Sequence, residues 1–246
     1  MVYFLSDMHL GARYLPDPRA AEQRVVRFLR SIRHDATDLY LMGDALDYWF
    51  EYRNVVPRGF VRFFGALAEL ADAGVRIHWY IGNHDIWLFD YLRTEIGMEV
   101  VDGWRVEQIL GSNFFLSHGD GVGELPFSFR LMRAIFRNRL CQRLFAAIHP
   151  RWTVGLAYSW SKSNRDFKHY ETPRFEGLER NSLARFARAY LAEHPKINYF
   201  VFGHQHIATD EKLSDTCRFV LLGDWITQFT YAKFDGKDLQ LCHFDT

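Results

Sequence analysis

The stretch Val2-Tyr3-Phe4-Leu5-Ser6-Asp7-Met8-His9 sets the pattern for the whole sequence. It begins with an apolar run and ends in a polar cluster that contains a carboxylate and an imidazole. Short runs rich in aromatic and β-branched residues are typical of buried strands. The pattern returns four more times: 38–42 precedes Gly43-Asp44, 75–81 precedes Gly82-Asn83-His84-Asp85, 113–117 precedes His118-Gly119-Asp120, and 198–202 precedes Gly203-His204-Gln205-His206.

The segments between these runs have apolar residues at helical spacing. They predict helices at 20–33, 61–73 and 181–194, and the alternation with strands indicates an α/β fold. From Arg218 onward, three apolar runs separated by turn signals predict a β-meander. In open α/β sheets, ligands bind beyond the carboxyl ends of the strands. Because all five polar clusters follow such ends, we expect them to form one composite site.

Length and composition limit the class of protein. The 246 residues suit one domain over 1–246, with a helical insertion at about 122–170. Lys+Arg and Asp+Glu both number 30, so the overall positive charge that favours nucleic acid is absent. Three scattered cysteines, no visible signal peptide and no long apolar stretch lead us to expect a cytoplasmic protein whose membrane contact is peripheral.

One segment differs from the rest in charge. Residues 125–165 contain no Asp or Glu but many basic residues, with apolar side chains interleaved among them. Two interpretations stay open. The segment is either an ordinary helix with a solvated basic face, or a surface that receives a ligand both anionic and strongly apolar, as a cap or as a membrane interface. The basic residues are Arg130, Arg133, Arg137, Arg139, Arg143, Arg151, Lys162 and Arg165.

The five polar clusters offer Asp, His and Asn, and no sulfur. Such oxygen and nitrogen donors suit Mn, Fe, Zn, Co or Mg. Two divalent ions about 3.5–4 Å apart form a clamp for phosphoryl transfer, and a carboxylate bridges such a pair well. The glycines that precede Asp44, Asn83 and His204 allow sharp turns through which the side chains converge.

In order and composition, the clusters resemble the five signature blocks of the calcineurin-like metallophosphoesterases. The blocks are Asp7-x-His9, Gly43-Asp44, Gly82-Asn83-His84-Asp85, His118-Gly119-Asp120 and Gly203-His204-x-His206, and the resemblance covers residues 1 to about 210. It implies a four-layered α/β sandwich with two divalent metal ions, Mn being the family expectation, at one edge.

The resemblance also implies roles for the matching residues. His84 would face the scissile phosphate, stabilise charge or protonate the leaving group, and Asp85 would orient it. Asp120 either caps a turn or acts near its histidine, and Asp224 has no assigned role. The implied metal ligands are Asp7, His9 and His206 for one ion, Asn83, His118 and His204 for the other, and Asp44 for both.

Within the superfamily, the chain is most similar to the UDP-2,3-diacylglucosamine pyrophosphohydrolases of lipid A biosynthesis. The similarity lies in 4–10, 40–49, the basic insert, 222–225 and 241–244. It implies hydrolysis of an acylated UDP-sugar to UMP and 2,3-diacylglucosamine 1-phosphate at the inner face of the cytoplasmic membrane. It also implies that polar residues of the cap bind substrate, namely Ser161, Lys162, Asn164 and Arg165.

One residue departs from that family's pattern. His84 stands where better-known members carry Arg, although His is the pattern of the wider superfamily. The departure keeps open a phosphodiesterase or phosphatase that acts on a soluble nucleotide or another phosphodiester. A non-enzymatic scaffold of the same fold is disfavoured because no implied ligand is missing. A nuclease is disfavoured by the neutral net charge.

Overall fold

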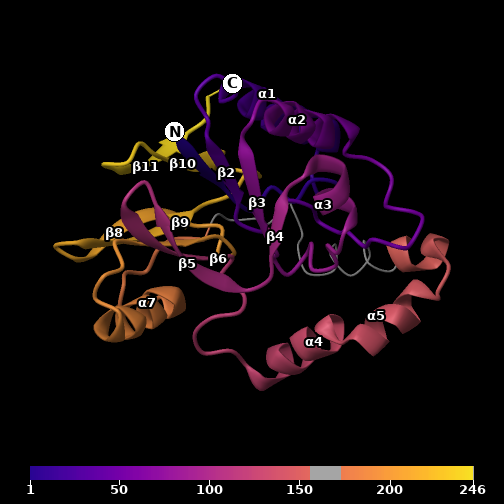
Figure 1. The fold of residues 1–246 in the computed structure, drawn as a ribbon. Helices are drawn as coiled ribbons and strands as arrows, with labels where there is room; N and C mark the ends of the chain where they lie inside the picture. Colours follow the sequence, from indigo (N-terminus) through magenta and orange to yellow (C-terminus); the bar gives the residue numbers. More distant parts are fainter. Residues whose placement is uncertain (156–172, 246) are drawn as a thin grey trace.

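Two β-sheets form the centre of the protein in a computed structural model that describes residues 1–155 and 173–245 (Figure 1). The six-stranded sheet has the order β11 (Leu239–His243), β10 (Thr230–Phe234), β1 (Val2–Leu5), β2 (Asp38–Leu41), β3 (Arg76–Tyr80) and β4 (Glu99–Val101). The five-stranded sheet has the order β5 (Trp104–Ile109), β6 (Ser112–Ser117), β7 (Tyr199–Phe202), β9 (Cys217–Leu222) and β8 (Ala208–Ser214).

Side-chain alternation in β1 explains how the layers pack. Val2 and Phe4 point into the core between the two sheets, where the Phe4 ring stacks on Phe114 of β6 at 5.7 Å between centroids. Tyr3 and Leu5 point the other way, into the core beneath the helices. Because successive residues of a strand face opposite sides, a strand buried on both faces is apolar throughout.

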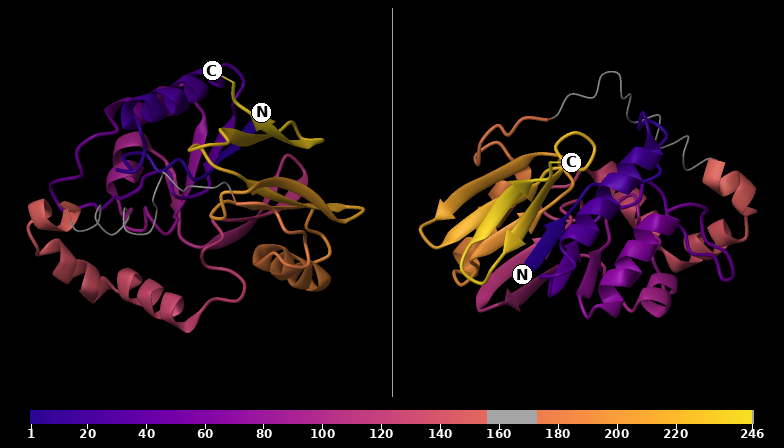
Figure 2. Two further views of the ribbon diagram at one scale, coloured as in Figure 1. Left: turned by 180° about the vertical axis from the view of Figure 1, so that it is seen from behind. Right: turned by 90° about the horizontal axis from the view of Figure 1, so that it is seen from above.

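Helices cover the outer faces of both sheets. The helices α1 (Pro18–Ser31), α2 (Val61–Asp72) and α3 (Tyr91–Ile96) pack on the six-stranded sheet, and α7 (Ser182–Glu193) packs on the five-stranded sheet (Figures 1 and 2). The side chain of Asp17 accepts hydrogen bonds from two backbone amides at the start of α1, and that of Asn181 accepts one from the Ala184 amide at the start of α7. The order is therefore helix, sheet, sheet, helix.

The three predicted helices and the five predicted strands are present. The strands after Arg218 differ from the predicted meander, because β9 belongs to the five-stranded sheet while β10 and β11 form a hairpin on the edge of the other sheet. The chain crosses between the sheets after β9. A local pattern of apolar runs does not encode that crossing, since either sheet can accept the next strand.

Two helices stand away from the sandwich. The helices α4 (Phe127–Arg137) and α5 (Arg139–Ala146) form an arm below the sheets in Figure 1. Neither helix has a buried residue, yet both lie in the segment expected to be helical. Within the described residues, no helix has the length and apolar character needed to cross a membrane.

Candidate active site

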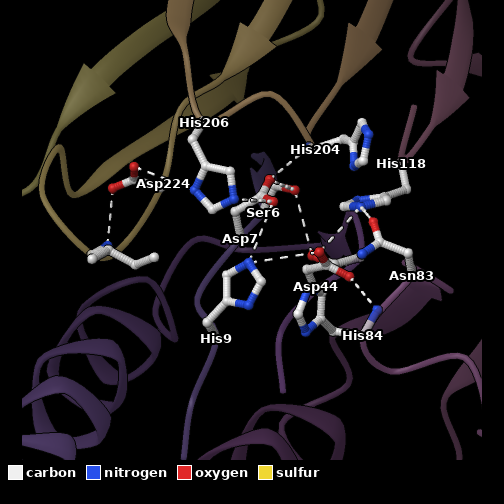
Figure 3. A network of polar contacts seen from close by, with 12 residues as sticks. Ser6, Asp7, His9, Asp44, Asn83, His84, His118, His204, His206 and Asp224 are labelled. Carbon is white, nitrogen blue, oxygen red and sulfur yellow. Dashed lines mark hydrogen bonds and ion pairs between the residues drawn. The ribbon is translucent and has the colours of Figure 1, made fainter. Parts of the chain in front are cut away.

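The loops after β1, β2, β3, β6 and β7 meet at one edge of the sandwich, as expected from the position of the five clusters (Figure 3). Several of their residues adopt left-handed backbone conformations with positive φ, which non-glycine residues rarely take. Such strain concentrates at functional sites, where the surrounding structure holds it. The residues are Asp7, His9, Asp44, His204 and His206.

Asp7, His9 and His206 form a first buried group of donors. Asp7 Oδ1 lies 3.4 Å from His206 Nε2 and 3.8 Å from His9 Nε2. All three side chains are buried, and their donor atoms lie within 4.8 Å of one another. This spacing lets three donors surround one ion.

Asp44 connects this first group to a second. Its Oδ2 lies 3.6 Å from His9 Nε2 and 3.4 Å from His118 Nε2, so one carboxylate faces both sides of the site. His118 Nε2 also lies 3.3 Å from Asn83 Oδ1. His204 stands beside this second group, its ring centroid 5.2 Å from that of His118. The structure thus brings together all seven predicted ligands.

The environment of Asp7 fits a cation. Its Oδ2 accepts hydrogen bonds from Ser6 Oγ at 2.6 Å and from the His204 amide at 2.8 Å. Its Oδ1 is buried and accepts no hydrogen bond from the residues that the structure describes. A buried carboxylate oxygen beside two imidazole nitrogens is a strong acceptor that lacks a donor, which suits a divalent ion.

Electrostatics keep the site carboxylates ionised. Burial alone disfavours the charged forms of Asp7 and Asp44, but the neighbouring imidazoles outweigh burial and lower the pKa of both carboxyls. For His118, burial opposes the charged form, while the negative charge of Asp44 prevails and raises its pKa to about 10. For His204, burial and the nearby His118 charge lower the pKa to about 4.

Two glycines permit the loops to converge by close approach. A Cβ at Gly82 would collide with Asp44 Oδ1, and a Cβ at Gly43, whose φ is +92°, would collide with the His118 ring. The expectation that glycines allow convergence therefore has a steric basis here.

Groups behind three of the site histidines fix their orientation. The Nδ1 atom of His206 lies 3.4 Å from Asp224 Oδ2, and that of His9 lies 3.4 Å from Asp47 Oδ1. The Nδ1 atom of His118 lies 2.8 Å from the carbonyl oxygen of Met42. Partners at Nδ1 turn Nε2 toward the carboxylates of Asp7 and Asp44.

Asp224 and Asp47 were not assigned roles from the sequence. Asp224 Oδ1 accepts backbone hydrogen bonds from residues 226, 227 and 228, and the bond to His206 helps to lower its pKa to about 2 against the effect of burial. Both aspartates have fully buried side chains. Their positions in Leu222-Gly223-Asp224-Trp225 and Asp44-Ala45-Leu46-Asp47, after strand-like runs, were the available signal.

His84 lies in the site beside Asp44. Its backbone amide donates to Asp44 Oδ1 at 2.9 Å, and its ring meets the His9 ring edge-on at 4.6 Å. Its Nδ1 lies 3.1 Å from the carbonyl oxygen of Asp47 and 3.5 Å from that residue's carboxylate. The groups that orient His84 in the structure therefore come from Asp47.

Asp85 was expected to orient His84, and its carboxylate points elsewhere. It accepts hydrogen bonds from the backbone amides of Ala45 and Gly82 and from Trp79 Nε1, at 2.8–3.1 Å. Burial and the negative charge of Asp44 raise its pKa to about 6. The turn at Gly82 directs Asp85 into the core, where it ties together the loops after β2 and β3.

Asp120 pairs with Arg133 of α4, so it contacts the arm in place of a turn amide. The four residues predicted to bind substrate lie outside the described residues: Ser161, Lys162, Asn164 and Arg165.

The sequence profile of the calcineurin-like phosphoesterases matches residues 1–208, and the chain belongs to this family. The predicted superfamily, the α/β fold class and the expectation of a metal-dependent hydrolase are thereby confirmed. Among curated relatives, a UDP-2,3-diacylglucosamine hydrolase of Porphyromonas gingivalis is 46% identical over 252 residues, which cover 98% of this chain and 96% of the relative.

More distant relatives carry the same description. A UDP-2,3-diacylglucosamine hydrolase of Neisseria gonorrhoeae is 27% identical over 242 residues, 95% of this chain and 94% of the relative. One of Serratia proteamaculans is 24% identical over 245 residues, 98% of each chain.

Proposed function

We propose that the chain hydrolyses the pyrophosphate bond of UDP-2,3-diacylglucosamine, giving UMP and 2,3-diacylglucosamine 1-phosphate, in lipid A biosynthesis. The observation that carries this proposal is the 46% identity to a UDP-2,3-diacylglucosamine hydrolase over 98% of the chain. The assembled Asp, His and Asn site supports it, since phosphoester hydrolysis by this family uses divalent metal ions. The prediction from the sequence and the relatives agree on the same substrate.

The proposed cofactor is a pair of divalent ions, with Mn as the proposed metal and Fe, Zn, Co or Mg as other candidates. When bound, such ions make water nucleophilic near neutral pH and neutralise charge on the phosphate. The proposed ligands are Asp7, His9 and His206 for the first ion, Asn83, His118 and His204 for the second, and Asp44 for both.

His84 is the proposed catalytic residue of the chain itself. The side chain of His84 is 19% exposed, so substrate can reach it. Nδ1 of His84 contacts Asp47, so Nε2, on the other side of the ring, is the atom available to the substrate. This nitrogen contacts the phosphate or donates a proton to the leaving oxygen. Asp85 supports this chemistry indirectly by fixing the loop that carries His84.

The arm is the proposed cap of a single domain and the site for the acyl chains. It exposes large apolar side chains beside its arginines, and its acid-free sequence suits an anionic lipid surface. We therefore propose peripheral contact with the inner face of the cytoplasmic membrane. Ser161, Lys162, Asn164 and Arg165 complete the proposed polar end of the cap. The exposed apolar residues of the arm include Phe127, Leu131, Ile135, Leu140 and Leu144.

The test is hydrolysis of UDP-2,3-diacylglucosamine with added Mn, beside unacylated UDP-sugars and bis-p-nitrophenyl phosphate. We expect metal-dependent UMP release from the acylated substrate, and loss of most of this activity in Asp44→Ala. Hydrolysis of the simple diester without the lipid substrate would instead favour a phosphodiesterase of another substrate, the alternative that His84 keeps open.

A further inference from the structure

A cavity of about 460 Å³ opens beside the site. His204, which lies across the carboxylates from His9 in Figure 3, forms part of its wall. The volume lies within the roughly 300–1,000 Å³ typical of small-molecule sites. A ligand in this cavity would therefore touch the second group of metal-facing residues.

Two arginines on the cavity wall have no anionic partner among the residues that the structure describes. The guanidinium groups of Arg174 and Arg180 make no ion pair or hydrogen bond with the rest of the described chain. Arg185 and Arg188 of α7, by contrast, pair with Glu124 and Glu179. The N-terminus of α7 also lies on the wall, through Asn181 and Ser182. Unpaired guanidinium groups beside a helix N-terminus favour an anion such as a phosphate.

The wall also offers neutral and acidic groups. Asn181 Nδ2 donates to Gln205 Oε1 at 2.6 Å, and Gln205 Nε2 donates to Ser182 Oγ at 3.4 Å, which fixes two amides side by side. Amides present donors and acceptors together, as does the carbonyl and imide edge of uracil. Glu124 and Glu176 supply acceptors for sugar hydroxyls. The polar groups of this lining suit a nucleotide.

We propose that this cavity binds the uridine 5′-phosphate half of the acylated UDP-sugar, an inference that rests on the function proposed above. The attacked phosphorus belongs to that half, so the nucleoside must lie one ester bond from the metal site. His204 borders both places. Hydrolysis adds the water oxygen to this phosphorus and breaks its bond to the bridging oxygen. UMP is then left in the cavity and the acylated sugar phosphate at the arm.

Calorimetric titration of the Mn-loaded protein tests the subsite, with UMP, ribose 5-phosphate and inorganic phosphate as probes. We expect UMP to bind the wild type at least about tenfold more tightly than either other probe, a gain of about 1.4 kcal/mol. Arg174→Ala and Arg180→Ala should each weaken UMP binding by about tenfold, because each removes a charge-assisted hydrogen bond. Arg27→Ala, on the exposed face of α1, is the matched control and should bind UMP as the wild type does.

The outcomes separate this inference from the proposed function. UMP binding no tighter than phosphate, or unchanged in both arginine variants, overturns the subsite. If the wild type hydrolyses the lipid substrate and both variants keep its KM, the function stands and the subsite fails. If the wild type binds UMP through these arginines but ignores the lipid substrate, the nucleotide site stands and the proposed function fails.

Discussion

At the scale of single residues, the groups that support the site histidines differ between the two sides of the site. His9 and His206, which face the first proposed ion, are each backed by a buried carboxylate, whereas His118 is backed by a backbone carbonyl. A carboxylate behind a histidine raises its basicity and fixes its tautomer. The first ion should therefore depend on Asp47 and Asp224 more than on any other residue that does not touch it.

This asymmetry predicts the effect of removing each charge. Asp47→Asn and Asp224→Asn should each weaken Mn binding by about 10- to 100-fold. Asn at 224 keeps an oxygen for the backbone amides, so the fold survives the change. Competition with a metal-binding dye measures the affinity, and Asp215→Asn, on an exposed turn, is the control. Unchanged affinity in both variants would contradict a positioning role.

Sequence patterns indicated the seven proposed ligands but missed these supporting aspartates, for a physical reason. Asp7, Asp44 and His118 stand directly after strands, so local order places them at one edge. Asp224 reaches His206 only because β7 and β9 are paired neighbours. Such a contact depends on the tertiary fold, and no local spacing encodes it.

At the scale of elements, ion pairs tie the arm to the loops of the site. Arg133 of α4 pairs with Asp120, which follows the His118 loop and is only 5% exposed. Trp87, after the His84 loop, donates through Nε1 to the carbonyl oxygen of Phe136 at 2.9 Å, and its ring stacks on Phe145. The arm is therefore held by two loops that also carry site residues.

Breaking the buried pair should destabilise the protein. Arg133→Met leaves the Asp120 charge buried without its partner, a loss that costs about 3 kcal/mol or more. Adding Asp120→Asn should recover at least half of that loss. Arg137→Met serves as the control, because its partner Asp102 is exposed and such pairs contribute at most about 1 kcal/mol. If Arg133→Met and Arg137→Met lower the free energy of unfolding equally in urea, the Arg133–Asp120 pair does not have the stabilising role described here.

A second element-scale feature links β2, β3 and β4. The His78 ring lies between Asp38 and Glu99, at 3.3 Å and 3.0 Å, and stacks on Tyr40. Burial disfavours the charged ring, but the two carboxylates prevail and raise the pKa of His78 above its usual 6.5.

Because the pKa of His78 is higher in the folded state, the direction in which pH changes the stability of the protein is determined. The stabilisation by His78 is complete below about pH 6.5 and is lost as the pH rises through the folded pKa. We therefore expect the unfolding free energies of the wild type and His78→Gln to differ most below about pH 6.5, and to converge as the pH rises through the raised pKa of the folded state. Urea unfolding across this range measures the difference, with exposed His34→Gln as control. A difference that grows with pH would contradict the assignment.

At the scale of the whole molecule, the sandwich makes one site from segments far apart in the sequence, such as Asp7 and the His204 amide, which are 197 residues apart. The sequence allowed the layers, the five strands and the convergence of the seven proposed ligands to be predicted, because each lies in a contiguous pattern. The sheet that β9 joins, the direction of Asp85 and the cavity beside His204 depend on how the layers pack. They became visible only in the structure.

The central claim is that a two-ion site performs the hydrolysis. The most direct measurement is UMP release from UDP-2,3-diacylglucosamine while Mn is titrated into metal-free protein. The account predicts activity that follows the binding of a second ion per chain, and little activity in Asp44→Ala, which lacks the carboxylate that faces both groups. Full activity without metal, or with one ion per chain, would contradict it.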